Sequence, residues 1–217
     1  MRKRKNIITV AIDSPAAAGA GTLAKNIARH YKLLYLDTGK LYRLIGKLTI
    51  DKNKLDYKNI RDKINKLNII ELNKKELLAD KIAIAASIIS RDIKVRKIVK
   101  YFQMKCAYNP PKIFSGSVLD GRDITSVIMK DSMFKFYVTA NLKVRARRRF
   151  NEFKKLKKRV SYKEVLKSLR KRDKLDKNRK HSPLKKTKDS ILINTSKLSK
   201  KASFLKIKRI MDNKLKN

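Results

Sequence analysis

Short apolar runs alternate with segments of helical periodicity along most of this chain. The apolar runs, rich in β-branched and aromatic residues as buried strands are, stand at 7–12, 33–36, 117–119, 134–139 and 191–193. Apolar positions spaced three and four apart predict helices at 22–31, 41–50, 144–153, 162–179 and from 197 onward. This alternation predicts an α/β fold of three layers with a parallel sheet in the centre.

The middle of the chain is less regular. Residues 51–109 are rich in Lys and Asn, and only weak helical patterns occur there, around 58–67 and 76–89. Within the second pattern, the Ala- and Ile-rich residues 83–89 predict a buried helix face. We find no internal repeat in the 217 residues, a length typical of one large domain.

The balance of charge is extreme, because 59 Lys and Arg stand against 18 Asp and Glu, a formal net charge of +41. Such a charge attracts polyanions and is typical of proteins that bind nucleic acid or anionic membranes. The cations are spread along the chain, which favours a Lys-rich composition laid over an ordinary enzyme surface. We therefore expect nucleic acid to bind only non-specifically, and we expect phosphate-bearing substrates to be attracted.

The remaining composition indicates a cytoplasmic protein. The one cysteine, Cys106, excludes an intramolecular disulfide, and two histidines give no zinc-binding pattern. Met1 to Lys5 is basic like the start of a secretion signal, but the apolar run after it stops at Asp13, which is too early. No apolar stretch approaches the 18 or so residues of a membrane span. We expect a monomer that does not bind membranes.

A loop of small residues follows the first predicted strand and precedes the first helix. The amides of such a loop, together with the helix dipole, form a site for phosphate. The loop reads S-P-A-A-A-G-A-G-T, and we expect nucleotide contacts from all nine residues: Ser14, Pro15, Ala16, Ala17, Ala18, Gly19, Ala20, Gly21 and Thr22. A plain strand-to-helix turn is the alternative at this stage.

The loop departs from the usual pattern G-x-x-x-x-G-K-[ST], in which the lysine reaches the β- and γ-phosphates. Ser14 replaces the first glycine and Ala20 replaces the lysine. The loss of that charge leaves three interpretations: another cation supplies it, turnover is slow, or the site is degenerate. Lys25 is one candidate cation, one turn into the helix but on a different face from Ala20.

Four further motifs follow the predicted strands. They read D-T-G-K-L-Y-R at 37–43, D-G-R-D at 120–123, R-D-K-L-D-K-N-R at 172–179 with S-P-L at 182–184, and N-T-S at 194–196. In order and spacing, these motifs and the phosphate loop resemble those of bacterial cytidylate kinases, which are P-loop nucleoside-monophosphate kinases. The resemblance covers about residues 7–210. Met104, where the family has arginine, and Asn194, where it has aspartate, depart from the pattern.

The resemblance implies a three-layer P-loop fold and a kinase reaction. The core would comprise about 5–45, 110–150 and 165–217, with a monophosphate-binding region at 46–109 and a short lid at 150–165. ATP with Mg²⁺ would be the phosphate donor, and CMP or dCMP the acceptor. Phosphoryl transfer depends on positioning and charge neutralisation. Three arginines are the implied catalytic residues: Arg122, Arg172 and Arg179.

The resemblance also implies the remaining contacts. Arg145 and Arg149 would face ATP, and Thr22 would bind Mg²⁺. Nine residues would bind the acceptor: Asp37, Thr38, Gly39, Tyr42, Arg43, Ser87, Arg96, Asp123 and Asp176. Among these, Arg43 would hold the α-phosphate, Ser87 and Arg96 the cytosine ring, Asp123 its exocyclic amine, and Asp176 the ribose.

Other interpretations of the same residues remain open. Arg43 is alternatively a surface arginine, Arg122 and Asp123 a structural pair, and residues 172–179 a solvated salt-bridged helix face. Asp37 fits either a water-mediated Mg²⁺ contact or a helix N-cap. At the level of function, the alternatives are a silent nucleotide- or nucleic-acid-binding protein with the kinase fold, and a kinase for UMP or for a shikimate-like alcohol.

Overall fold

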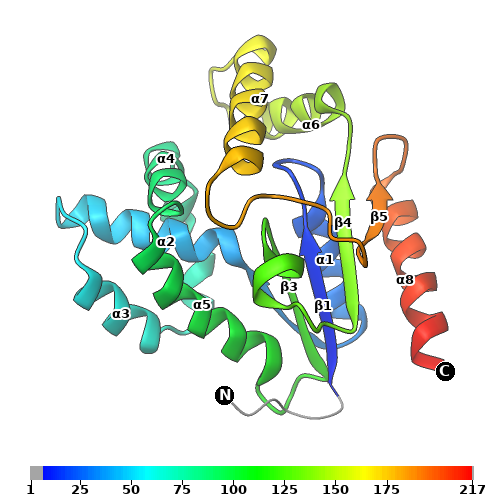
Figure 1. The fold of residues 1–217 in the computed structure, drawn as a ribbon. Helices are drawn as coiled ribbons and strands as arrows, with labels where there is room; N and C mark the ends of the chain where they lie inside the picture. The colour runs from blue at the N-terminus through cyan, green and yellow to red at the C-terminus, as the bar shows by residue number, and fades with distance from the viewer. Residues whose placement is uncertain (1–6, 217) are drawn as a thin grey trace.

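The centre of the protein is a five-stranded, fully parallel sheet with the strand order β2-β3-β1-β4-β5 (Figure 1). The computed structural model describes residues 7–216. The strands are β1 (Ile8–Asp13), β2 (Leu33–Asp37), β3 (Gly116–Gly121), β4 (Phe134–Thr139) and β5 (Ile191–Asn194). All five lie where the apolar runs predict strands, because each run is long enough only to cross a buried sheet.

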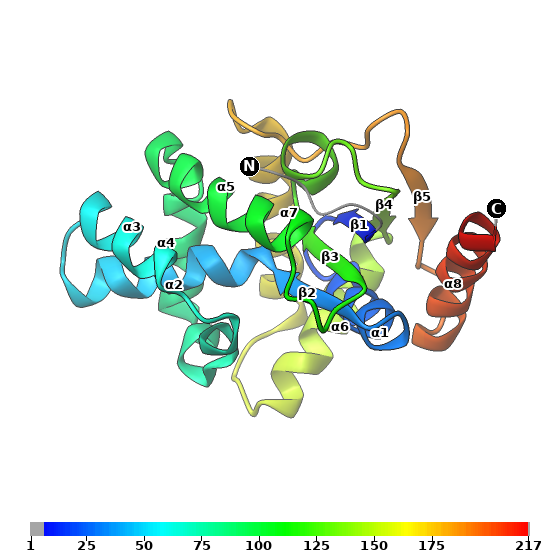
Figure 2. The same cartoon turned by 90° about the horizontal axis from the view of Figure 1, so that it is seen from below.

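Helices cover both faces of the sheet. They are α1 (Ala20–His30), α2 (Thr38–Asp51), α3 (Tyr57–Asn65), α4 (Asp80–Ile89), α5 (Ile93–Tyr108), α6 (Leu142–Lys155), α7 (Tyr162–Asn178) and α8 (Lys200–Lys216). Three short turns complete the chain: η1 (Ile69–Asn73), η2 (Lys75–Leu78) and η3 (Ile124–Ile128). Figures 1 and 2 place α2 to α5 on one side of the molecule and α8 on the other. The expected three-layer α/β fold is confirmed.

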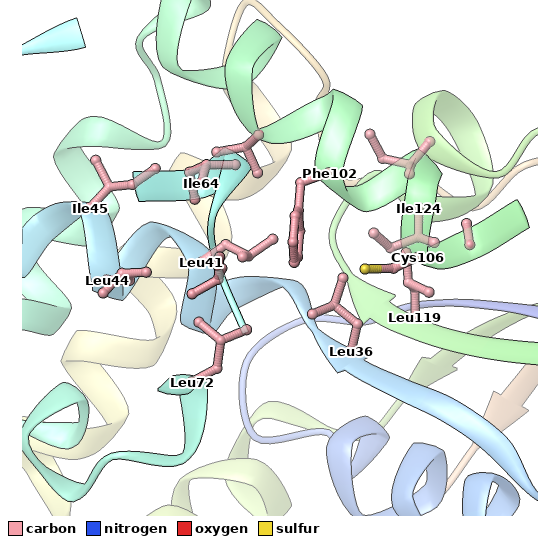
Figure 3. Close-up of a cluster of buried hydrophobic side chains, with 14 of the residues drawn as sticks. Leu36, Leu41, Leu44, Ile45, Ile64, Leu72, Phe102, Cys106, Leu119 and Ile124 are labelled. Atoms are coloured by element: carbon pink, nitrogen blue, oxygen red, sulfur yellow. The ribbon is translucent and has the colours of Figure 1, made fainter. Parts of the chain in front are cut away.

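Alternation along the strands explains the two layers. Val10 and Ile12 pack with α1 and α8, whereas Ala11 between them packs with the helices of the other side. The sheet and the helices α2, α3 and α5 share one core, in which Leu36 and Leu119 of the strands meet Phe102 (Figure 3). Region 46–109 is therefore packed directly onto the sheet, while its boundaries as a functional unit stay a prediction.

Helix α5 is the main departure from the predicted elements. Sequence patterns in this region predict only weak helices, yet α5 runs for 16 residues and buries Val95, Val99 and Phe102. It begins where the side chain of Asp92 accepts a hydrogen bond of 2.8 Å from the amide of Val95, an N-cap that fixes its start. The segment predicted as one helix at 76–89 instead breaks at Ala79, between η2 and α4.

Helices α6 and α7 form a pair above the phosphate loop (Figure 1). Ala146, Val165 and Leu169 bury the contact between them, and Ala16 and Ala17 of the loop pack against the same cluster. The predicted lid at 150–165 thus spans the end of α6, the connection and the start of α7.

Two observations concern the predictions of a secretion signal and of a membrane span. Met1 to Lys5, considered above as the start of a secretion signal, lies outside the described residues. Among residues 7–216, no helix has both the length and the apolar character needed to cross a membrane.

Candidate active site

The carboxyl ends of β1, β2 and β3 bring the predicted motifs together. The parallel register sets Asp13 opposite Gly121, and Asp37 opposite Asp120. The phosphate loop leaves β1 here, anchored by the amide of Ser14, which donates to the carbonyl of Gly121 over 3.1 Å. Ligands in open α/β sheets bind at this edge of the strands, so the motifs share one site.

The backbone of the phosphate loop has the shape of an anion cradle. Gly19, the N-cap of α1, has a φ of 93°, and Ala17 has a φ of 60°. A left-handed alanine costs roughly 1 kcal/mol or more and is typical of functional loops. Ala20 begins α1 with its methyl group buried, so this position brings no charge to the site. The amides at the start of α1 remain available for phosphate.

Asp13 fixes the loop that follows β3, a role that the motifs did not indicate. Its buried carboxylate accepts hydrogen bonds from the amides of Ile124 (2.7 Å) and Thr125 (2.8 Å) and from the Thr125 hydroxyl (2.6 Å). Burial raises the pKa of Asp13 to about 6, against the opposite effect of these hydrogen bonds. Because Arg122 and Asp123 directly precede this turn, Asp13 sets their position relative to the phosphate loop.

Two carboxylates lie side by side next to the start of α1. Burial, and then the charge of Asp37, raises the pKa of Asp120 to about 8. The hydroxyl of Tyr35 donates to the Asp120 side chain, and the hydroxyl of Thr38 donates to the Asp120 carbonyl over 2.8 Å. Among residues 7–216, Oδ1 of Asp120 is buried without a hydrogen-bond partner. A buried polar atom of this kind calls for a partner, which a bound ligand or ion would supply.

Guanidinium groups converge beside these carboxylates. Nε of Arg122 donates to Asp176 over 2.8 Å, and Nε of Arg172 lies 4.0 Å from the same carboxylate. Loss of surrounding water and then the charge of Arg122, with smaller effects of Arg43 and Arg149, lower the pKa of Arg172 to about 10 against the opposite effect of Asp176. Arg122 and Arg172 share Asp176 and stand close to further arginines, so the cluster is suited to an anion.

A cavity of about 200 Å³ next to Arg122 is lined by Arg96 and Asp123, two of the three residues predicted to bind the base; Ser87 is not among its lining residues. Arg96 and Asp123 pair across it at 2.5 Å, and Arg179 lies 3.6 Å from the other oxygen of Asp123. The ring of Tyr42 lies below Arg96, and burial raises the pKa of its hydroxyl to about 12. The cavity is also lined by Ser182 of the S-P-L motif and by Gln103 and His181, which the motifs did not indicate.

Other predicted residues lie less directly at the cavity. Arg43 donates to the carbonyl of Leu77 over 2.8 Å. Ser87 and Arg96 are connected through Ser90, whose hydroxyl donates to the Ser87 carbonyl and whose carbonyl accepts from Arg96. Gly39 lies in the first turn of α2, where a Cβ would stand 3.2 Å from Oδ1 of Asp37.

One geometric expectation is wrong, although the role given to the residue stays a prediction. Arg172, Asp176 and Arg179 were expected near one helix face, but α7 ends at Asn178 and Arg179 has extended backbone angles. Its Nε donates to the carbonyl of Ser182, which turns the guanidinium toward Asp123.

The arginines of α6 have different partners in the structure, and the assignment of Arg145 and Arg149 to ATP stays a prediction. Arg145 is buried and donates to both oxygens of Asp173, over 3.1 and 2.6 Å, and to the carbonyl of Ala16 over 3.0 Å. Arg149 pairs with Glu152 over 2.8 Å on the exposed side of the helix. Arg148, which the motifs did not indicate, lies on the phosphate loop, with Nη1 3.8 Å from where a Cβ of Gly19 would be.

Replacement of Arg145 by methionine should loosen the α6–α7 pair from the loop. The change leaves Asp173 and the Ala16 carbonyl without their donor, and we expect a loss of about 2–3 kcal/mol in the free energy of unfolding, as for hydrogen bonds to charged groups. Urea denaturation measures it, with the exposed Lys143→Met on the same helix as the control. Equal stability of the two variants would contradict this role.

Comparison with known proteins agrees with this geometry. Residues 10–212 match the model of the cytidylate kinase family. The cytidylate kinase of Bartonella henselae is 44% identical over 205 residues, which cover 90% of each chain. The cytidylate kinase of Brucella suis is 41% identical over 208 residues, covering 95% of this chain and 93% of that enzyme.

Similarity to a solved structure concerns the fold alone. A crystal structure of an uncharacterized protein from Eubacterium ventriosum superposes with a TM-score of 0.56 at 17% identity, covering 94% of this chain and 98% of that one. The sequence matches are much closer and run through every motif described above. This chain belongs to the cytidylate kinase family.

Proposed function

We propose that this protein transfers the γ-phosphoryl group of ATP to CMP or dCMP, giving CDP or dCDP and ADP. The observation that carries the proposal is the cluster of Arg122, Arg172 and Arg43 between the phosphate loop and the cavity that contains Arg96 and Asp123. The γ-phosphate of ATP bound at the loop and the phosphate of CMP bound beside the cavity would meet at these arginines. Positioning and neutralisation of charge are what phosphoryl transfer requires.

The residues present fit Mg²⁺ brought by ATP. Thr22, Asp37 and Asp120 offer hard oxygen ligands at the strand ends, and Oδ1 of Asp120 is buried without a partner among the described residues. Mg²⁺ typically takes one or two carboxylates together with phosphate oxygens and water. Residues 7–216 contain no group of three or more acidic, histidine or cysteine ligands, which argues against a site made by protein alone. When bound, Mg²⁺ supplies charge neutralisation at the β- and γ-phosphates.

The side chains of the site divide the remaining tasks. Loop amides within 16–22 hold the β-phosphate, while Arg122 and Arg172 bind the oxygens of the transferred group. The acceptor phosphate is already anionic, so no strong general base is needed for its attack. Arg145, through Asp173 and Ala16, ties the α6–α7 pair to the loop, and closure of that pair would exclude water.

Acceptor choice is assigned to the cavity. Asp123 would accept a hydrogen bond from the exocyclic amine of cytosine, with Arg96 and Ser87 on the acceptor edge of the ring and Asp176 on the ribose. Uracil carries an oxygen in place of that amine. This oxygen can only accept hydrogen bonds, so it would repel the Asp123 carboxylate. We further propose that the protein acts as a monomer in the cytoplasm and binds nucleic acid only non-specifically.

A coupled assay of ADP formation with ATP, Mg²⁺ and each of CMP, dCMP, UMP and AMP tests the proposal. We expect turnover that requires CMP or dCMP and falls strongly with UMP. Binding of ATP without turnover of any monophosphate would contradict the proposal. Binding of RNA or DNA with a steep dependence on salt would then favour the nucleic-acid-binding alternative.

A further inference from the structure

The phosphate loop of this chain lacks the cation that such loops usually present to the β- and γ-phosphates. Ala20 occupies that position, and its methyl group is only 4% exposed against the sheet. At the same edge, Asp37 and Asp120 lie side by side close to the start of α1 and bring no positive charge. The site therefore needs positive charge from another residue to receive a polyphosphate.

The position of Lys25 on α1 follows from helix geometry. Lys25 is five residues after Ala20 and so lies about 140° around the helix from it, but it lies only about 40° from Gly21, one turn earlier. Side chains on a helix lean toward its N-terminus, so Lys25 extends back along the face of Gly21 toward the phosphate loop.

Gly21 leaves that path open. A Cβ at Gly21 would stand 3.5 Å from Oδ2 of Asp120 and 3.5 Å from the hydroxyl of Tyr35, so this face of α1 looks into the site. The Lys25 ammonium is near enough to Asp120 to lower the pKa of that carboxyl, while the rest of the residue remains exposed. A lysine side chain spans the turn of about 5.4 Å that separates it from Gly21.

Two other cations beside the loop, Arg145 and Arg148, are committed to protein acceptors. Arg148 donates to the Thr195 carbonyl over 2.7 Å and to the Thr195 hydroxyl over 3.0 Å. Arg145 is held by Asp173 and Ala16. The side chain of Lys25 lies near Asp120. Mg²⁺ brought by the nucleotide would bind this carboxylate, and the Lys25 ammonium would then be free to bind phosphate.

We propose that Lys25 supplies to the phosphates of ATP the positive charge that Ala20 does not. The proposal rests on the proposed function. In the transfer, the bond from the γ-phosphorus to the β,γ-bridging oxygen breaks, a bond to a phosphate oxygen of the acceptor forms, and ADP leaves. Lys25 binds phosphate oxygens throughout, and no proton moves to or from it.

Four proteins test the assignment: the parent, Lys25→Met, Ala20→Lys and the double variant. In the ADP assay with CMP, Lys25→Met should lower kcat of the parent by about 10²-fold, as expected for loss of one charge-stabilising donor. In the Ala20→Lys background the same change should cost less than about threefold, because the loop then carries its own lysine. Lys25→Arg should retain most of the parent's activity.

Arg29→Met is the matched control, an exposed cation one turn further along α1 whose guanidinium donates to Asn26. It should leave kcat unchanged in both backgrounds. Thermal unfolding of every variant, with and without ATP, reports whether it is folded.

The outcomes separate the two proposals. An equal loss from Lys25→Met in both backgrounds, or no loss in the parent, would overturn the assignment of Lys25. Turnover by Ala20→Lys but not by the parent would overturn it as well, while the proposed function stands. If neither protein phosphorylates CMP or dCMP, the proposed function itself fails.

Discussion

Arg172→Met is expected to lower kcat for CMP phosphorylation by about 10³-fold while the protein stays folded. Arginines that stabilise the transferred phosphoryl group contribute about 10³ to 10⁵ in rate. Arg172 has the surroundings of such a residue, because the nearby charges of Arg122, Arg43 and Arg149 lower its pKa and its one carboxylate neighbour, Asp176, lies 4.0 Å away. Since its side chain is 46% exposed, little packing is lost with it.

The control for Arg172→Met is Arg170→Met, an exposed arginine two residues earlier on the same helix. Steady-state kinetics should show no change for Arg170→Met and an unchanged urea midpoint for both variants. A higher KM with an unchanged kcat would instead assign Arg172 to ground-state binding and contradict the prediction.

The sheet and most helices could be predicted because their signals are local. Each strand is built on a short run of mostly apolar residues, and a run of that length is typical of a strand in a covered sheet. Helix α5 was missed since its buried positions, such as Val95 and Val99, alternate with lysines that extend to solvent. Its N-cap at Asp92 was a local signal that could have located its start.

In the candidate site, too, residues with a local sequence signal could be predicted and their distant partners could not. Arg122 and Asp123 were located by sequence because they follow a strand whose end lies at the ligand-binding edge. The partners of these residues come from elsewhere: Asp176 from α7, and Arg96 from α5. Which of them pair depends on how distant helices pack, and no local pattern carries that information.

The arginines of α6 show most clearly what sequence patterns do not predict, namely the direction in which a helix face points. Periodicity places Arg145 and Arg149 on one face of the helix, and the family resemblance directs that face to ATP. In the structure Arg145 is used for the contact with Asp173, and Arg148 reaches the phosphate loop. The direction of a helix face is set by the whole α6–α7 pair, through the buried contacts of Ala146 with Val165 and Leu169. The assignments of Arg145 and Arg149 to ATP stay predictions.

Asp123→Ala is expected to lower both stability and the preference for cytosine. Asp123 is 6% exposed and neutralises Arg96 and Arg179, which are themselves nearly buried. Removal of one partner from a buried ion pair costs about 3–5 kcal/mol, because the remaining charge is left without compensation. Urea denaturation measures this loss. The control is Glu152→Ala, which breaks an ion pair whose side chains are 38% and 61% exposed and should cost less than about 1 kcal/mol.

Asp123→Asn separates selectivity from stability if the alanine variant does not fold. The amide keeps the shape and can accept from Arg96, but it can also donate to the O4 of uracil. We expect the ratio of kcat/KM for CMP over UMP to fall by about 10- to 100-fold, the effect of exchanging one buried acceptor for a donor. An unchanged ratio would mean that Asp123 only positions Arg96 and Arg179, and cytosine recognition would then rest on the arginine and on Ser87.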